Sequence, residues 1–209
     1  LMMRLQHFRV SGIERYTNTI THQIDGMTNL LNEFLFVSKV ESGKFQLQIE
    51  ELSVVDFLQD LVKEHYQPWK DRRTIQLQVV GTPIDIHFDK RMMFHIINNL
   101  LSNAVKFTNI GHVTLSATWT GQELVIGVRD TGPGIAPQVQ EVVFERFRQA
   151  TSFVTREHGG TGLGLALVRE FVKLMGGKLQ LNSQLGVGSY FEFAIPELNQ
   201  EAHAANLDH

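Results

Sequence analysis

The sequence predicts an α+β fold: a two-layer sandwich in which a mixed sheet packs on helices, preceded by a long N-terminal helix with a coiled-coil-like pattern. Three observations support this fold class. Candidate strands and helices are both present, but they do not alternate strictly as they would in a βαβ series. Hydrophobic residues make up 43% of the 209 residues, which is enough to fill a core. A sustained heptad pattern precedes the first candidate strand, so we expect the long helix to be a segment of its own.

Residues 13–40 are expected to form this long helix. Large side chains recur in alternating steps of three and four, the spacing of a heptad seam, at Ile13, Tyr16, Ile20, Gln23, Met27, Leu30, Phe34 and Val37. Ile24, Leu31 and Leu35 widen the apolar stripe, which favours a helix bundle over a two-stranded coil. We expect the helix to self-associate into a homodimer; the alternative is a helix that packs only on its own domain. Gly43, which suits a left-handed cap, ends it.

The remaining elements divide the chain into residues 1–43, a domain of residues 44–198 and a tail of residues 199–209. Alternating polar and apolar residues predict strands at residues 44–49, 74–80, 112–119, 123–130, 178–182 and 189–195. Periodicity and cap signals predict helices at residues 54–69, 90–107 (capped by Asp89) and 163–175, with a short one after Pro137. Residues 145–161 are polar and lack periodicity, so they predict a long loop.

Composition excludes several classes of function. The chain carries 19 Lys and Arg against 22 Asp and Glu, so its formal charge of −3 gives no electrostatic footprint for nucleic acid. It has no Cys, which excludes a disulfide framework, a Cys-ligated zinc site and a thiol nucleophile. No run of 18 apolar residues and no signal peptide is visible, so we expect a cytoplasmic location and leave the membrane attachment of the parent protein open. The first residue is not Met, so we expect an excised fragment.

The predicted helix of residues 90–107 carries one polar stripe on an otherwise apolar surface. At about 100° per residue, four of its side chains fall within about 80° of one another: His95, Asn99, Asn103 and Lys106. Amide oxygens suit Mg²⁺, which usually takes one or two protein oxygens and fills its shell with phosphates and water. A lysine adds a point charge for phosphate. The alternative is the solvated face of an ordinary amphipathic helix.

Three glycine-rich segments follow this helix. Residues 130–134 (Asp-Thr-Gly-Pro-Gly) end a predicted strand, where glycines allow close approach and the Asp can accept a hydrogen bond from an exocyclic amine such as that of adenine. Residues 159–167 run into a helix and would present its positive end to an anion. Residues 186–191 form a double-glycine turn with a supporting role. Taken singly, each segment is also compatible with a plain turn or linker. A P-loop and the serine/threonine kinase motifs are absent from the sequence.

In this order, the segments resemble the catalytic and ATP-binding domain of bacterial sensor histidine kinases, within the GHKL superfamily. The motifs span about residues 44–196 and resemble, in turn, the N box, first glycine box, F box, second glycine box and last glycine motif of that family: residues 95–107, 130–134, 144–147, 160–164 and 186–191. The resemblance implies a Bergerat-type sandwich that holds ATP between the N-box helix and the glycine boxes.

The resemblance also implies residue roles. Asn103 would ligate Mg²⁺, Asn99 would support the phosphates and Lys106 would contact them. Asp130 would hold the adenine amine, with Phe107 packing on the base. Either Arg146 or Arg148 would reach the γ-phosphate from a mobile lid of residues 145–161. The remaining positions that match nucleotide-binding motifs are Thr131, Gly132, Gly134, Ile135, Phe147, Gly160, Thr161, Gly162, Leu163 and Gly164.

The implied activity is that of a protein histidine kinase that uses ATP and Mg²⁺. It would transfer the γ-phosphoryl group to a histidine on a dimerisation hairpin, for relay to an aspartate of a response-regulator receiver domain. Residues 13–43 resemble the second helix of that hairpin. His7 and His22 lack the acidic neighbour of the family's acceptor histidine, so we expect the acceptor to precede Leu1 and the fragment to be unable to autophosphorylate.

Two other functions stay open at this point. A hydrolase of the same superfamily would need a carboxylate base on the N-box helix, and residues 91–107 contain neither Asp nor Glu. A degenerate module would use the heptad helix for signalling and leave the pocket without nucleotide. Steady-state phosphate release would indicate the first, and failure to bind any nucleotide would indicate the second.

Overall fold

The computed structural model describes residues 45–65, 73–121, 123–148 and 162–196, together with separate positions between residues 16 and 42. The chain forms two compact units, Leu1–Phe45 and Gln46–His209. In the first unit, the described residues between 16 and 39 are helical. Several seam residues there are exposed, among them Tyr16, Ile20 and Met27. The coiled-coil-like helix and its self-association stay predictions.

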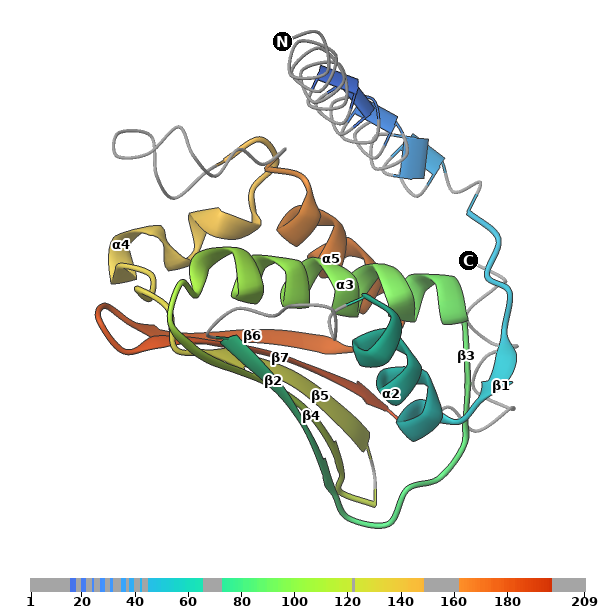
Figure 1. The fold of residues 1–209 in the computed structure, drawn as a ribbon. Coiled ribbons are helices and arrows are strands. Elements are labelled where there is room, and N and C mark those ends of the chain that lie inside the picture. Colours follow the sequence, from blue (N-terminus) through green and yellow to red (C-terminus); the bar gives the residue numbers. More distant parts are fainter. Residues whose placement is uncertain are drawn as a thin grey trace, which may run out of the picture. The chain divides into compact units, whose positions relative to one another are not determined.

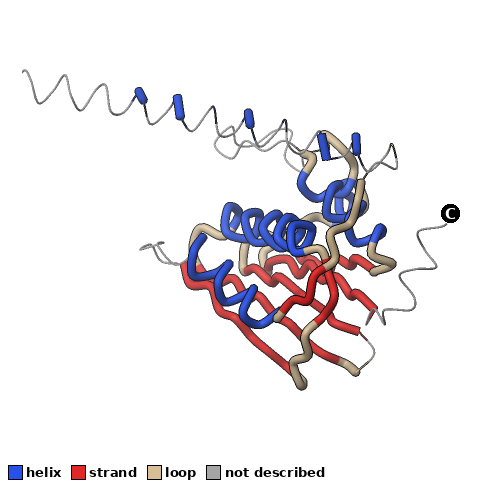
Figure 2. Tube along the Cα trace, turned by 90° about the vertical axis from the view of Figure 1, so that its right-hand side faces the viewer, coloured by secondary structure: helices blue, strands red, loops and turns tan. Residues whose placement is uncertain are grey.

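The second unit contains a mixed five-stranded sheet covered on one face by helices (Figure 1 and Figure 2). Its strand order is β2-β4-β5-β7-β6. The strands are β2 (Arg73–Val80), β4 (Gly111–Trp119), β5 (Glu123–Asp130), β6 (Lys178–Gln184) and β7 (Gly188–Pro196). β2 pairs with β4 in parallel, and the other neighbours are antiparallel. The predicted α+β class with a mixed sheet on helices is therefore confirmed.

The helices and the remaining strands complete this unit. The covering helices are α2 (Val54–His65), α3 (Lys90–Phe107) and α5 (Gly164–Leu174), with the short α4 (Pro137–Gln140) and the 3-10 turn η1 (Val142–Phe144) between β5 and α5. A separate antiparallel pair joins β1 (Glu50–Leu52) to β3 (Ile86–Phe88). None of the helices in the described residues is long and apolar enough to cross a membrane.

The core lies between α3, α5 and the inner face of the sheet. α3 buries one whole side, made of Met92, Met93, Ile96, Ile97, Leu100, Leu101, Ala104 and Val105. The sheet meets it with fully buried residues such as Leu115, Ile126 and Phe193. Burial of this apolar side fixes the rotation of α3 about its axis. The orientation of the opposite side, which carries the polar stripe, is therefore fixed as well.

The strand predicted at residues 44–49 is wrong. Residues 45–49 have no regular structure, and β1 begins at Glu50. Strand pairing decides this, because β1 pairs with β3, a short strand that the sequence did not predict. Ahead of it, the backbone N–H of Gln48 donates to the side chain of Asp89 and not to a neighbouring strand. Residues 66–69 of the predicted helix 54–69 lie outside the described residues.

Candidate functional site

The polar stripe of α3 lies at the border between the core and solvent. Asp89 occupies the N-cap position as predicted, and its side chain accepts from the backbone N–H groups of Arg91 and Met92. Further along the helix, Asn99, Asn103 and Lys106 are all partly buried. The stripe is thus held in place by the burial of the opposite side and presents two amides and a cation to one region.

The first turn of α5 meets the middle of this stripe at Gly164. A Cβ atom added there would collide with Oδ1 of Asn99, so a glycine is required for this approach. Asn99 is oriented by its own Nδ2, which donates to the backbone oxygen of His95 at 2.9 Å. Leu163 stands at the N-cap position of α5 and has no side-chain oxygen to cap it. The positive end of α5 therefore lies beside an amide of α3, which is an arrangement that suits an anion.

The C-terminal end of α3 meets the first glycine segment. The N–H of Gly132 donates to Oδ1 of Asp130 at 2.8 Å. A Cβ on Gly132 would lie 2.9 Å from the backbone oxygen of Phe107, the last residue of α3. Asp130 is 7% exposed, and burial raises the pKa of its carboxyl, a rise that hydrogen bonds from Gly132 and Ser189 oppose only in part. The carboxyl group is therefore buried and close to α3, in surroundings that disfavour its charged form.

The turn between β6 and β7 supports this glycine segment from the other side. Gly134 has a φ of 71° and lies directly against the backbone of Gln184. The N–H of Gly186 donates to the oxygen of Pro133 at 2.8 Å. The N–H of Ile135 donates to Oγ of Ser183 at 2.7 Å. The last glycine motif thus has the supporting role that the sequence predicts.

Two serines complete this support, and neither was predicted as an individual site residue, although Ser189 lies in the segment of residues 186–191. Ser189 bonds to Asp130, and its Oγ lies 3.0 Å from Oγ of Ser183. Ser189 directly follows the last glycine turn, which is the only signal that could have indicated it. Ser183 carries no local signal, because its contact with Ile135 joins residues that are 48 positions apart in the chain. The hydroxyl of Thr131 bonds to the backbone of His112 in β4, which ties the start of this segment to the sheet.

The F-box and second glycine segments also touch. The N–H of Phe147 donates to the oxygen of Gly162 at 2.9 Å, and both residues have positive φ values, 60° and 71°. Phe147 is 68% exposed. Arg146 and Arg148 are exposed too, and Arg148 pairs with Glu145 at 3.1 Å. Gly160 and Thr161, and residues 149–161 of the predicted loop, lie outside the described residues.

Two titratable groups on the polar stripe of α3, Lys106 and His95, have lowered pKa values. Burial lowers the pKa of Lys106, whose Nζ lies 5.1 Å from the centroid of the Phe107 ring. Burial and then the charge of Arg91 lower the pKa of His95. The ring of His95 lies 6.2 Å from that of Phe171 in α5, so it packs at the contact between the two helices.

Amides on α3, the positive end of α5 and glycine turns around a buried carboxyl group together define an ATP-binding α+β domain of the GHKL class. The chain belongs to the family described as histidine kinase-, DNA gyrase B- and HSP90-like ATPase, whose model matches residues 88–199. The resemblance drawn from the ordered motifs is confirmed.

Relatives at the sequence level are sensor kinases. The chain is 36% identical over 174 residues to the autoinducer 2 sensor kinase/phosphatase LuxQ of Vibrio cholerae, a match that covers 80% of this chain and 20% of LuxQ. It is 32% identical over 188 residues to the sensor histidine kinase RcsC of Salmonella typhimurium, covering 88% of this chain and 20% of RcsC. The chain thus spans about a fifth of the length of these relatives. It carries the catalytic ATPase domain of the sensor histidine kinases.

A solved structure, full-length ShkA in complex with AMPPNP, has the same fold with a TM-score of 0.73 and 29% identity. The match covers 82% of this chain and 36% of that one. AMPPNP is an ATP analogue, so a structural neighbour of this chain binds a nucleotide of the expected kind.

Proposed function

We propose that this domain binds Mg–ATP along the polar stripe of α3 and directs the γ-phosphoryl group to a histidine of a dimerisation hairpin. The observation that carries the proposal is the approach of Asn99 to the start of α5 at Gly164, because it joins an amide and a helix N-terminus where phosphates would lie. The product would be relayed to an aspartate of a response-regulator receiver domain.

The adenine end of the site is built around Asp130. Its carboxyl group accepts from the N–H of Gly132 and from Ser189, and acceptor capacity remains for a further donor. An exocyclic amine is such a donor. Phe107, at the end of α3, is 42% exposed, and its backbone lies next to Gly132; its aromatic side chain would pack on the base. Gly132, Gly134 and Ile135 would line the base.

The phosphate end is built around Asn99, Asn103 and Lys106. The described residues contain no group of three His, Asp or Glu side chains that could hold a metal. The amide oxygen of Asn103 fits Mg²⁺, which commonly takes one or two protein oxygens and gains the rest from phosphates and water. When bound, Mg²⁺ would neutralise phosphate charge. Lys106 would add a positive charge, and Arg146 or Arg148 would approach the γ-phosphate.

Phosphoryl transfer needs alignment and charge neutralisation more than covalent help from the protein. The acceptor imidazole nitrogen would bond to the γ-phosphorus while the bridging bond to ADP breaks, and the imidazole proton would pass to solvent. Hydrolysis is disfavoured because α3 offers no Asp or Glu after its N-cap to activate water.

Self-association through residues 13–40 belongs to the same proposal, and the exposed seam residues support it. We retain the division into residues 1–43, 44–198 and 199–209, next to the compact units that meet at Phe45 and Gln46. Because ATP is the substrate, the domain would work in the cytoplasm.

The proposal is tested by titrating AMPPNP into the protein with and without Mg²⁺, by calorimetry. We expect Asn103→Ala to weaken the Mg-dependent part of the affinity by about tenfold, equivalent to about 1.4 kcal/mol. Asn182→Ala, an exposed asparagine of β6, is the matched control and should bind as the wild type does. An Asn103→Ala protein with unchanged affinity in Mg²⁺ would contradict the proposed site.

A further inference from the structure

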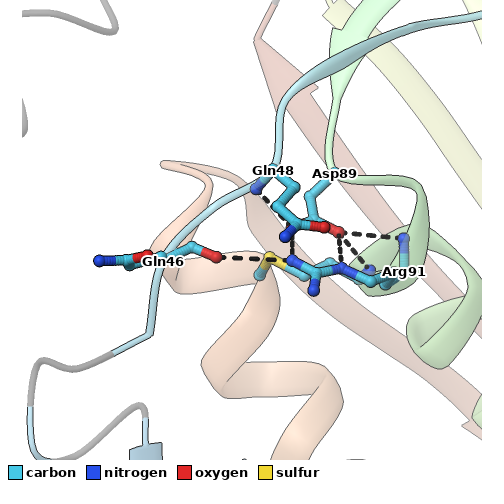
Figure 3. Close-up of polar contacts among 5 residues, drawn as sticks. Gln46, Gln48, Asp89 and Arg91 are labelled. Carbon is cyan, nitrogen blue, oxygen red and sulfur yellow. Dashed lines mark hydrogen bonds and ion pairs between the residues drawn. The ribbon is translucent and has the colours of Figure 1, made fainter.

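The side chain of Asp89 does more than cap α3. It is 1% exposed, and its Oδ1 accepts from the N–H groups of Arg91 at 3.0 Å and Met92 at 3.2 Å, which is ordinary capping. Its Oδ2 accepts from the N–H of Gln48 at 2.8 Å, a residue 41 positions earlier in the chain. One carboxylate thus joins the start of α3 to the segment that leads into the catalytic unit (Figure 3).

Arg91 strengthens the same junction. Its Nε lies 3.2 Å from Oδ1 of Asp89 and its Nη2 lies 2.8 Å from Oδ2, so the guanidinium holds the carboxylate with both arms. The same Nη2 donates to the backbone oxygen of Gln46 at 3.5 Å (Figure 3). We call Gln46, Gln48, Asp89 and Arg91 the linker clamp. It fixes the incoming backbone at two points, one N–H and one C=O.

Helix capping alone does not require these extra bonds. A serine at the N-cap position would satisfy the first turn of α3 equally well. The bonds to Gln46 and Gln48 instead determine where the chain enters the catalytic unit, since Gln46 is the first residue of that unit and Phe45 the last of the preceding one. α3 then runs for 18 residues, about 27 Å, and carries Asn99 and Asn103.

Resting on the proposed kinase function, we propose that Asp89 and Arg91 are positioning residues for phosphoryl transfer. They fasten the point where the N-terminal unit joins the catalytic unit to the N-terminus of the helix that bears the phosphate-binding amides. The linker clamp thereby transmits a movement of the N-terminal unit to α3, which a flexible linker would not do. Nucleotide binding itself needs only α3, α5 and the glycine turns, so it does not depend on the clamp.

The test uses the whole kinase chain and two variants. Asp89→Ser keeps a capping oxygen but has no second oxygen to accept hydrogen bonds from both Arg91 and Gln48. Arg91→Lys keeps the positive charge but cannot form the bidentate pair with Asp89. We expect the dissociation constant for AMPPNP to stay within about twofold, and the rate of histidine phosphorylation at saturating ATP to fall about tenfold. Amide hydrogen exchange at Gln48 should rise by at least about tenfold. Arg169→Lys, an exposed arginine of α5, is the matched control.

Each other result overturns the inference in a recognisable way. If exchange at Gln48 rises but the phosphorylation rate is unchanged, the clamp is structural only. If affinity for AMPPNP falls as much as the rate, the two residues act through the nucleotide site. If the wild-type form of the whole kinase chain binds AMPPNP but phosphorylates no histidine, the proposed function is wrong. The inference, which rests on that function, is then wrong as well.

Discussion

Asp89 and Asp130 are both buried carboxyl groups, and they lie at the two ends of α3, yet their surroundings are opposite. Burial raises the pKa of Asp89, but hydrogen bonds from Arg91, Gln48 and Met92 together with the charge of Arg91 lower it more, so the net shift is downward. For Asp130 burial outweighs the bonds from Gly132 and Ser189, so the net shift is upward. The surroundings of Asp89 therefore favour its charged form, whereas those of Asp130 favour its protonated form.

The difference separates a structural carboxyl group from one suited to a ligand. A buried carboxylate that the chain itself satisfies contributes to folding. A buried carboxyl group whose charged form is disfavoured marks a candidate functional site. Under the two proposals, the N-terminal end of α3 holds the linker and the C-terminal end binds the nucleotide.

The largest effect on stability is expected for Asp89→Ala. It removes the helix cap and leaves the N–H of Gln48 without its acceptor, so we expect the free energy of unfolding to fall by about 3 kcal/mol. Urea denaturation measures this, with Asp56→Ala, an exposed acid of α2, as control. A loss no larger than that of the control would show that Asp89 is not structural.

Asp130→Asn should give the reverse pattern. We expect affinity for AMPPNP to fall by about 2 kcal/mol, roughly 30-fold, because a charged acceptor for the adenine amine is lost. The free energy of unfolding without nucleotide should be unchanged or slightly higher, because the neutral amide relieves desolvation. Calorimetry and urea denaturation of the same sample measure both. Unchanged affinity, or destabilisation as large as that of Asp89→Ala, would refute the assignment.

Gly164→Ala extends the comparison to the middle of α3. The added Cβ would meet Oδ1 of Asn99 and push the amide away from the start of α5. We expect AMPPNP affinity to fall by about 1.4 kcal/mol, or tenfold. The melting temperature should change little, because alanine favours a helix by about 1 kcal/mol over glycine and offsets the crowding. A protein that melts normally and binds normally would show that this contact does not shape the phosphate site.

The smallest expected effect is in pH dependence. The raised pKa of Asp130 means that its protonated form favours the folded state, and this contribution is lost as the pH rises through the folded-state pKa. The stability advantage of Asp130→Asn over wild type should therefore be largest at neutral pH and shrink in acid. The lowered pKa of Asp89 has the opposite sign, because its contribution is lost as the pH falls through the folded-state pKa. The deficit of Asp89→Ala should persist down to about pH 4 and shrink only below it. Denaturation curves at several pH values test both signs.

Local signals predicted most of the helices and strands correctly. Asp89 followed by an apolar periodic run gave both ends of α3, and alternation located β4 and β5. The sequence did not predict the short strands β1 and β3, because a three-residue strand is too short to show periodicity and because their pairing joins distant parts of the chain.

The residues of the candidate site likewise differ in whether a local sequence signal predicts them. Glycine turns and the asparagine stripe were visible because each needs a particular residue type at a particular spacing. Ser183 was not visible, since its role depends on the register of β6 against β7. The hold of Asp89 on Gln48 was also hidden, because the cap alone explained the aspartate.

The parallel pairing of β2 with β4 has a consequence for how the domain folds. α3 lies in the chain between these two strands, so it is the crossover that brings them into register. Such a non-local pairing is expected to form slowly. The helix that we propose as the nucleotide-binding helix therefore also connects the two parallel strands, so we expect substitutions on its buried side to impair folding of the domain as well as binding.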